Sequence, residues 1–178
     1  MRLSSCFALI LSLAFAAVPL CAQKQQRDPL TGPQVEKIRE AGIDPAERVK
    51  LYTQFVDEHV DSIKALGKRA HSVARARRLD DELQDLTALM DELGSNLDVY
   101  SERKADIRRS LKPLTDASQR WLEVLRSLTS EPGFDLSLKE AIDSGKDVAD
   151  QAATMLREQT EYFDLHKDER GQDRAEPK

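Results

Sequence analysis

Cysteine is scarce in this sequence of 178 residues: there are two, Cys6 and Cys21, and both lie close to the N-terminus. The chain after residue 21 therefore cannot form a disulfide bond within itself. It also offers no thiolate nucleophile, no CxxC redox motif, no CxxCH haem attachment and no cysteine zinc site. The fold of this part must be held by its core alone.

Glycine and aromatic residues are also few, with 7 glycines and 5% aromatic residues against 33% charged residues. This balance is typical of long amphipathic helices, and no alternating pattern indicates a strand. The formal net charge is −5, so nothing drives non-specific binding of nucleic acid. The Gly-x-Ser-x-Gly, HExxH and Glu-x-x-His motifs and a glycine-rich phosphate loop are all absent, so we expect neither an enzyme nor a cofactor.

Long apolar runs are limited to residues 7–18, which follow the positively charged Arg2. A run of about a dozen residues is too short to span a membrane and is typical of a secretory signal peptide. We expect residues 1–22 to be this signal, cleaved after Ala22 during export to the periplasm or the medium. The alternative is a lipoprotein signal in which Cys21 carries the lipid. Residues 23–30 are polar and predict a flexible linker.

The dominant feature of the sequence is one apolar stripe between residues 79 and 128. At steps of seven, every side chain is apolar or aromatic: Leu79, Leu86, Leu93, Tyr100, Ile107, Leu114, Trp121 and Leu128. Most of the positions four residues further on are apolar too, namely Leu83, Met90, Leu97, Leu111 and Leu125. Residues at these spacings share one face of a helix, so the stripe must be covered by other helices.

Helix boundaries follow from capping signals. Thr31, with Gln34 three residues on, predicts a short helix that ends at Gly42. Asp44, followed by Pro45 and Glu47, predicts the start of a second helix.

We expect this second helix to be continuous to about residue 93, through a three-residue phase shift of its apolar face at 74–79. A reversal at 94–96 is favoured over one continuous helix, because a second helix must return to cover the first. The next helix then covers residues 97–128, with a kink at Pro113. The last begins at a capping box of Ser137 and Glu140 and ends near residue 165, and residues 166–178 predict a charged, disordered tail.

These elements predict an all-α protein. Its domain, residues 31–165, is expected to be an elongated antiparallel three-helix bundle, coiled-coil-like, with a short extra N-terminal helix after the signal peptide.

The string Leu30-Thr31-Gly32-Pro33-Gln34 resembles the LTxxQ motif of the periplasmic Spy and CpxP family of stress chaperones. That resemblance implies a small helical hairpin that acts by contact. It covers five residues, and the capping box alone explains Thr31 and Gln34.

Two sets of side chains are candidates for binding. Lys68, His71, Arg75 and Arg78 form a basic stripe at helical spacing, which would suit an anionic partner. The other interpretation is a solvated face in which Arg77 pairs with Asp81 and Arg78 with Glu82. His59 lies on the apolar face of its helix and could be a core-edge histidine, or a metal or haem ligand together with Met90 or Met155.

The sequence therefore predicts an exported, non-enzymatic helical protein that acts by protein–protein contact, in a structural, adaptor or chaperone-like role. The partner is an unidentified protein, and a homodimer is an option because the stripe is long. The alternatives are a metal- or haem-binding bundle using His59 or His71, and a helical protein associated with an anionic membrane surface through the basic stripe.

The predicted signal peptide can be tested with a Cys21→Ala variant expressed in a Gram-negative host. Cleavage after Ala22 does not depend on a lipidated thiol, so both wild type and variant should yield a mature chain that starts at Gln23. Mass spectrometry of the purified proteins gives the N-terminus. A diacylated Cys21 that is lost in the variant would favour the lipoprotein alternative, and an intact Met1 would contradict both.

Overall fold

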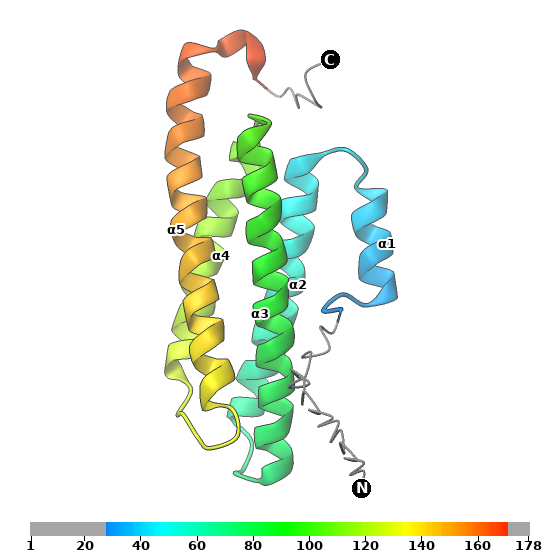
Figure 1. The fold of residues 1–178 in the computed structure, drawn as a ribbon, viewed down its shortest axis with the longest axis vertical. Coiled ribbons are helices and arrows are strands. Elements are labelled where there is room, and N and C mark those ends of the chain that lie inside the picture. Colours follow the sequence, from blue (N-terminus) through cyan, green and yellow to red (C-terminus); the bar gives the residue numbers. More distant parts are fainter. Residues whose placement is uncertain (1–27, 171–178) are drawn as a thin grey trace, which may run out of the picture.

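The computed structural model describes residues 28–170, which contain five α-helices and one short 3₁₀-helix (Figure 1). The helices are α1 (Gly32–Glu40), α2 (Pro45–Gly67), α3 (Val73–Glu102), α4 (Arg108–Ser127) and α5 (Asp135–Leu165), followed by η1 (Lys167–Glu169). The prediction of an all-α helical bundle is confirmed. The expected signal peptide, residues 23–27 of the linker and residues 171–178 of the tail lie outside the described residues.

Two of the predicted helix starts are confirmed. Thr31 and Gln34 form a reciprocal capping box at α1. Asp44 caps α2, and its carboxylate accepts the backbone N–H groups of Ala46 and Glu47. Ser137 instead lies inside α5, where its hydroxyl bonds to Asp80 on α3, and α5 begins two residues earlier at Asp135.

The predicted count of three long helices is not confirmed, because the chain turns at different places. Residues 68–72 separate α2 from α3, so the expected helix continuous to about residue 93 is wrong; the break lies before the phase shift expected at 74–79, which falls inside α3. Ser72 starts the new helix by accepting the backbone N–H of Arg75. The expected reversal at 94–96 is wrong, since Gly94 lies in the middle of α3.

Residues 103–107 separate α3 from α4, and this connection contains no glycine. Lys104 adopts the left-handed conformation there, with φ of 52°. The amide of Gln159 on α5 holds this connection: its Nε2 donates to Ala105 O at 2.8 Å, and its Oε1 accepts from Ile107 N at 3.1 Å. α4 then continues through Pro113 without a break.

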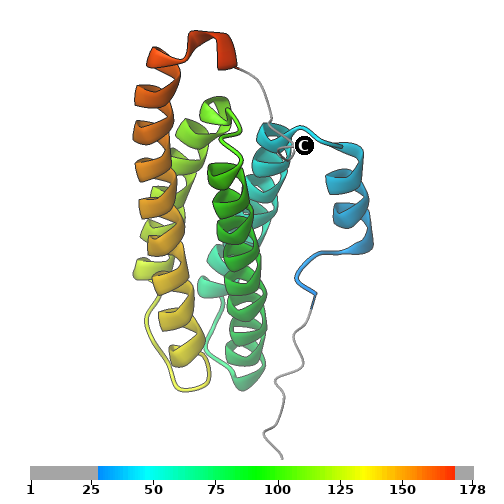
Figure 2. The same cartoon turned by 45° about the horizontal axis from the view of Figure 1, so that its top comes forward.

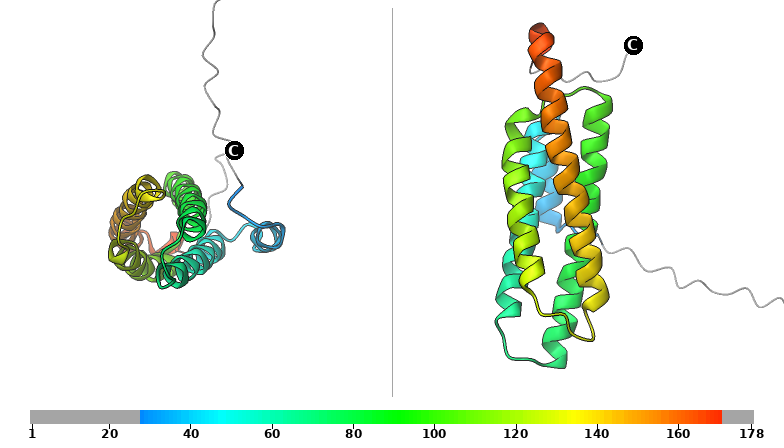
Figure 3. Two further views of the ribbon diagram at one scale, coloured as in Figure 1. Left: turned by 90° about the horizontal axis from the view of Figure 1, so that it is seen from below. Right: turned by 90° about the vertical axis from the view of Figure 1, so that its left-hand side faces the viewer.

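Four helices surround the core in the order α2, α3, α5, α4 (Figures 2 and 3). α2 and α4 run in one direction, and α3 and α5 run in the other (Figure 1). The bundle therefore consists of two antiparallel pairs, α2–α3 and α4–α5. Where the two pairs pack together, α2 lies beside α4 and α3 beside α5, and these neighbours run parallel. The connection from α3 to α4 crosses the diagonal of the bundle, because these consecutive helices do not pack against each other.

Polar contacts fix this arrangement along its length. Between the parallel helices α3 and α5, Ser144 Oγ donates to Asp91 Oδ1 at 2.7 Å and Gln151 Nε2 donates to Asp98 Oδ1 at 2.6 Å. Between α2 and α4, the indole N–H of Trp121 donates to Asp57 at 2.6 Å. Each contact joins residues at the same height in two different helices and so fixes their register.

The predicted apolar stripe fills the core. Of its eight seven-residue positions, all but Leu128 are buried, and Leu128 packs against the core in a partly buried position. At about 1.5 Å per residue, the 30 residues of α3 make the bundle roughly 45 Å long. α1 lies outside this bundle and packs only on α2 (Figure 3). Within residues 28–170, no helix is both long and apolar enough to cross a membrane.

Replacing Gln159 by leucine tests the role of its amide. The variant leaves the buried Ala105 carbonyl and Ile107 N–H without partners, so the free energy of unfolding should fall by about 2–4 kcal/mol. Urea unfolding measures the loss. The control is Gln119→Leu on the exposed face of α4, which should stay within about 0.5 kcal/mol of wild type. Equal stability of the two variants would show that the connection does not depend on Gln159.

Candidate functional site

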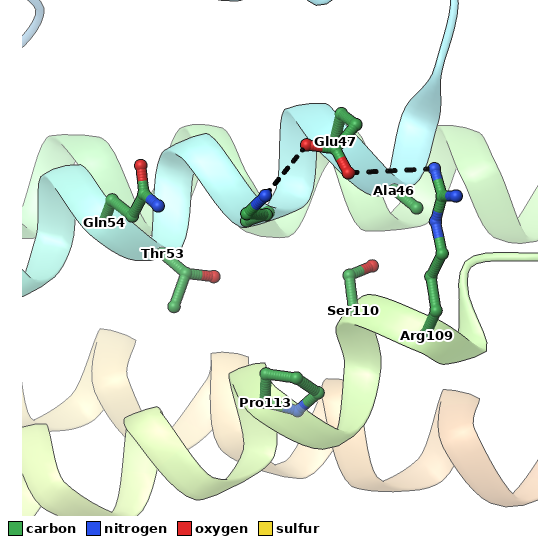
Figure 4. Close-up of a pocket in the computed structure, with 8 residues that line it drawn as sticks. Ala46, Glu47, Thr53, Gln54, Arg109, Ser110 and Pro113 are labelled. Atoms are coloured by element: carbon green, nitrogen blue, oxygen red, sulfur yellow. Dashed lines mark hydrogen bonds and ion pairs between the residues drawn. The ribbon is translucent and has the colours of Figure 1, made fainter.

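Two hollows lie between α2 and α4, at opposite ends of this parallel pair. The first is a groove of about 300 Å³ near the N-termini of both helices (Figure 4). Its lining comes from two turns of α2 and the first two turns of α4: Ala46, Glu47, Lys50, Thr53, Gln54, Arg109, Ser110 and Pro113. Small side chains such as Ala46 and Ser110 face each other here and leave space between the helices.

The charges at the rim of this groove compensate one another. Lys50 Nζ lies 3.2 Å from one carboxylate oxygen of Glu47. Arg109 lies 4.0 Å from the other carboxylate oxygen (Figure 4). Arg109 also pairs with Asp44, the residue that caps α2. The groove is therefore apolar inside with a neutral rim, and no unpaired charge selects a ligand.

The second hollow, which we call the basic pocket, lies at the other end, where α2 and α4 finish. It has a volume of about 280 Å³ and is lined by Lys64, Gly67, Lys68, His71, Arg75, Val124, Ser127, Leu128, Thr129 and Glu131. The α2–α3 connection and the α4–α5 connection close it from two sides. Four cationic or titratable nitrogen groups thus line one cavity with a single carboxylate.

Arg75 is the buried cation of the basic pocket, and three contacts hold its guanidinium in place. Its side chain is only 6% exposed, and it donates to the carbonyls of Leu66 at 3.0 Å and Gly67 at 3.2 Å. Its third contact is Glu131 Oε1 at 2.8 Å. One guanidinium therefore caps the end of α2 and ties it to the α4–α5 connection.

The carboxylate of Glu131 contacts two of the basic side chains of the pocket. His71 Nδ1 lies 3.0 Å from the same Oε1 that Arg75 contacts. The hydrogen bond from Arg75, assisted by His71, holds the pKa of the Glu131 carboxyl below its ordinary value of 4.5. The carboxylate is thus kept in its charged form.

The structure separates the four predicted basic residues. Lys68, His71 and Arg75 line the basic pocket, while Arg78 lies further along α3, exposed and outside the lining. They do not form a helical stripe, because residues 68–72 are not helical and Arg75 turns inward. Sequence reasoning missed Glu131, which is 56 residues from Arg75 and shows no local signal.

The end of the bundle where α2 meets α3 carries an excess of positive charge. Between Ser62 and Leu79 the chain has six Lys or Arg residues and no Asp or Glu. Five of them are exposed and form no ion pair with any described residue: Lys64, Lys68, Arg69, Arg77 and Arg78. We call these five residues the basic end. The expected pairing of Arg78 with Glu82 does not form, because Glu82 contacts His59 instead.

The contact with Glu82 also gives His59, the predicted metal-ligand candidate, a partner in the structure. His59 Nδ1 lies 2.9 Å from Glu82 Oε2, joining α2 to α3. Met90 and Met155 are buried in the core. Across residues 28–170, no three His, Cys, Asp or Glu side chains gather as a group that could hold a metal ion.

Comparison with known proteins adds no relative: no family model, curated protein or solved structure matches the chain. The resemblance to the LTxxQ motif therefore stays at five residues. The structure gives Thr31 and Gln34 a local role as a capping box, and its four-helix bundle differs from the hairpin that the motif implies.

A Glu131→Gln variant tests the ion pairs of the basic pocket through their pH dependence. Because folding lowers the pKa of Glu131, its contribution to stability is present above pH 4.5 and is lost as the pH falls through the lower, folded-state pKa. Wild type should therefore be more stable than the variant near neutral pH, and the difference should shrink below about pH 4.5. Urea unfolding across this range measures it.

The matched control is Glu123→Gln on the exposed face of α4, which should change stability little at any pH. A gap between wild type and Glu131→Gln that stays constant from neutral to acid pH would contradict the role of Glu131.

Proposed function

We propose that this protein is an exported, non-enzymatic helical bundle that acts by contact, and that its basic end docks on an acidic partner protein. The observation that carries the proposal is the set of five exposed cations around the α2–α3 connection that form no ion pair with any described residue. In a chain whose net charge is −5, the segment from Ser62 to Leu79 carries basic residues and no Asp or Glu, and complementary charge steers and orients association.

The way the bundle is built supports contact as the mode of action. Interhelical polar bonds join α2 to α3, α2 to α4 and α3 to α5, so the basic end sits on a framework with fixed register. Arg75 and Glu131 fix the connection that carries it. Such a surface can recognise a partner without rearranging, which lowers the entropic cost of binding.

A second copy of the chain is a less favoured partner. The length of the apolar stripe was the reason to expect one, but the stripe is buried within the bundle of a single chain. It therefore leaves no extended apolar face for a dimer. The exposed apolar side chains include Ile43, Val73 and Leu165, which belong to different segments.

The proposal can be tested with poly-L-glutamate as a defined acidic probe. Reversing three charges of the basic end, in Arg69→Glu/Arg77→Glu/Arg78→Glu, should weaken binding by about tenfold or more at low salt. The control variant Arg103→Glu/Arg157→Glu/Lys167→Glu makes the same change in net charge at exposed sites elsewhere and should weaken binding much less. Fluorescence anisotropy at several salt concentrations measures the affinities.

Equal loss in the two variants would contradict the proposal, because net charge alone would then explain the binding. Binding to anionic vesicles but not to poly-L-glutamate, lost in the first variant, would replace the acidic protein by a membrane surface.

A further inference from the structure

The basic pocket differs from the rest of the basic end because it is hollow. A carboxylate-bearing surface can be recognised by exposed cations alone and needs no cavity behind them. The pocket has about 280 Å³, room for several waters at about 30 Å³ each, and Lys64, Lys68 and His71 line it from α2 and the α2–α3 connection.

We propose that the basic pocket binds a single phosphate group through Lys64, Lys68 and His71. This inference rests on the proposed function, since Lys64 and Lys68 belong to the basic end, and it names the chemical group that the pocket takes. A phosphate group offers three acceptor oxygens and up to two negative charges, which matches donors that converge from α2 and from the α2–α3 connection.

The charge balance of the pocket favours such a ligand. Arg75 and the one lining carboxylate, Glu131, neutralise each other at 2.8 Å. Lys64 and Lys68 form no ion pair with a described residue, and their two positive charges remain available. His71 contacts Glu131 through Nδ1, so its Nε2 can donate to a phosphate oxygen when the ring is protonated and can accept from a phosphate O–H when the ring is neutral.

Side-chain donors offset part of the negative charge that the helix ends present to an anion here. α2 and α4 both finish at the pocket, and their last carbonyls carry partial negative charge. Arg75 covers the carbonyls of Leu66 and Gly67, and the hydroxyl of Ser127 donates to the carbonyl of Val124 at 2.7 Å.

The test is a titration of the purified protein with inorganic phosphate, at constant ionic strength in chloride. Saturable shifts of backbone amide NMR signals should appear at residues 64–75 and 127–131, with a Kd on the order of 1 mM or tighter. The variant Lys64→Met/Lys68→Met removes two charged donors and should weaken phosphate binding by at least about tenfold. Both lysines are exposed, so the fold should persist, and the amide spectrum checks this.

The matched control is Arg69→Met/Arg78→Met, which removes two cations of the basic end that do not line the pocket. Its affinity for phosphate should equal that of wild type, while its affinity for poly-L-glutamate falls. A parallel titration with vesicles containing phosphatidic acid shows whether a lipid headgroup presents the phosphate group as well as, or better than, the free ion.

Absence of saturable phosphate binding, or an equal loss of phosphate affinity in the two variants, would overturn the pocket proposal. Docking on an acidic protein would still be tested separately by poly-L-glutamate binding. Conversely, phosphate binding that depends on Lys64 and Lys68, without any binding of poly-L-glutamate, would retain the pocket and reject docking on an acidic protein.

Discussion

Burial of one apolar stripe is the constraint on which the rest of this structure depends. The stripe continues at seven-residue steps from Leu79 to Leu128, although the chain reverses at residues 103–107 in the middle of it. Its two halves belong to α3 and α4, which lie diagonally across the bundle, and both halves face the centre. Two further helices, α2 and α5, are needed to close the remaining sides of the core.

The diagonal placement of α3 and α4 determines where the basic pocket forms. Because α4 starts across the bundle from the end of α3, it becomes the parallel neighbour of α2. Both helices then finish at the same end, beside the segment from Ser62 to Leu79 that carries six Lys or Arg residues. A bundle in which consecutive helices were always neighbours would have placed these features differently, and α4 would not line the pocket.

Arg75 shows how stability and recognition share one side chain. Its guanidinium caps α2 and pairs with Glu131 from the α4–α5 connection, which removes it from the pool of cations open to a ligand. The same pair neutralises Glu131 but not the two lysines, so the proposed phosphate site keeps a net positive charge. The helix caps thus leave a net positive cavity.

The sequence by itself determined the helical class, the buried stripe and the caps at Thr31 and Asp44, because these depend on residue spacing and on contacts between near neighbours. It also located the basic segment through its charge. Only the tertiary structure decided the number of helices and the places where they break. The reversal uses Lys104 rather than a glycine, and it is held by Gln159 from 54 residues away. The pairing of Arg75 with Glu131 has the same origin. Contacts of this kind join residues that are distant in sequence, and no local spacing records them.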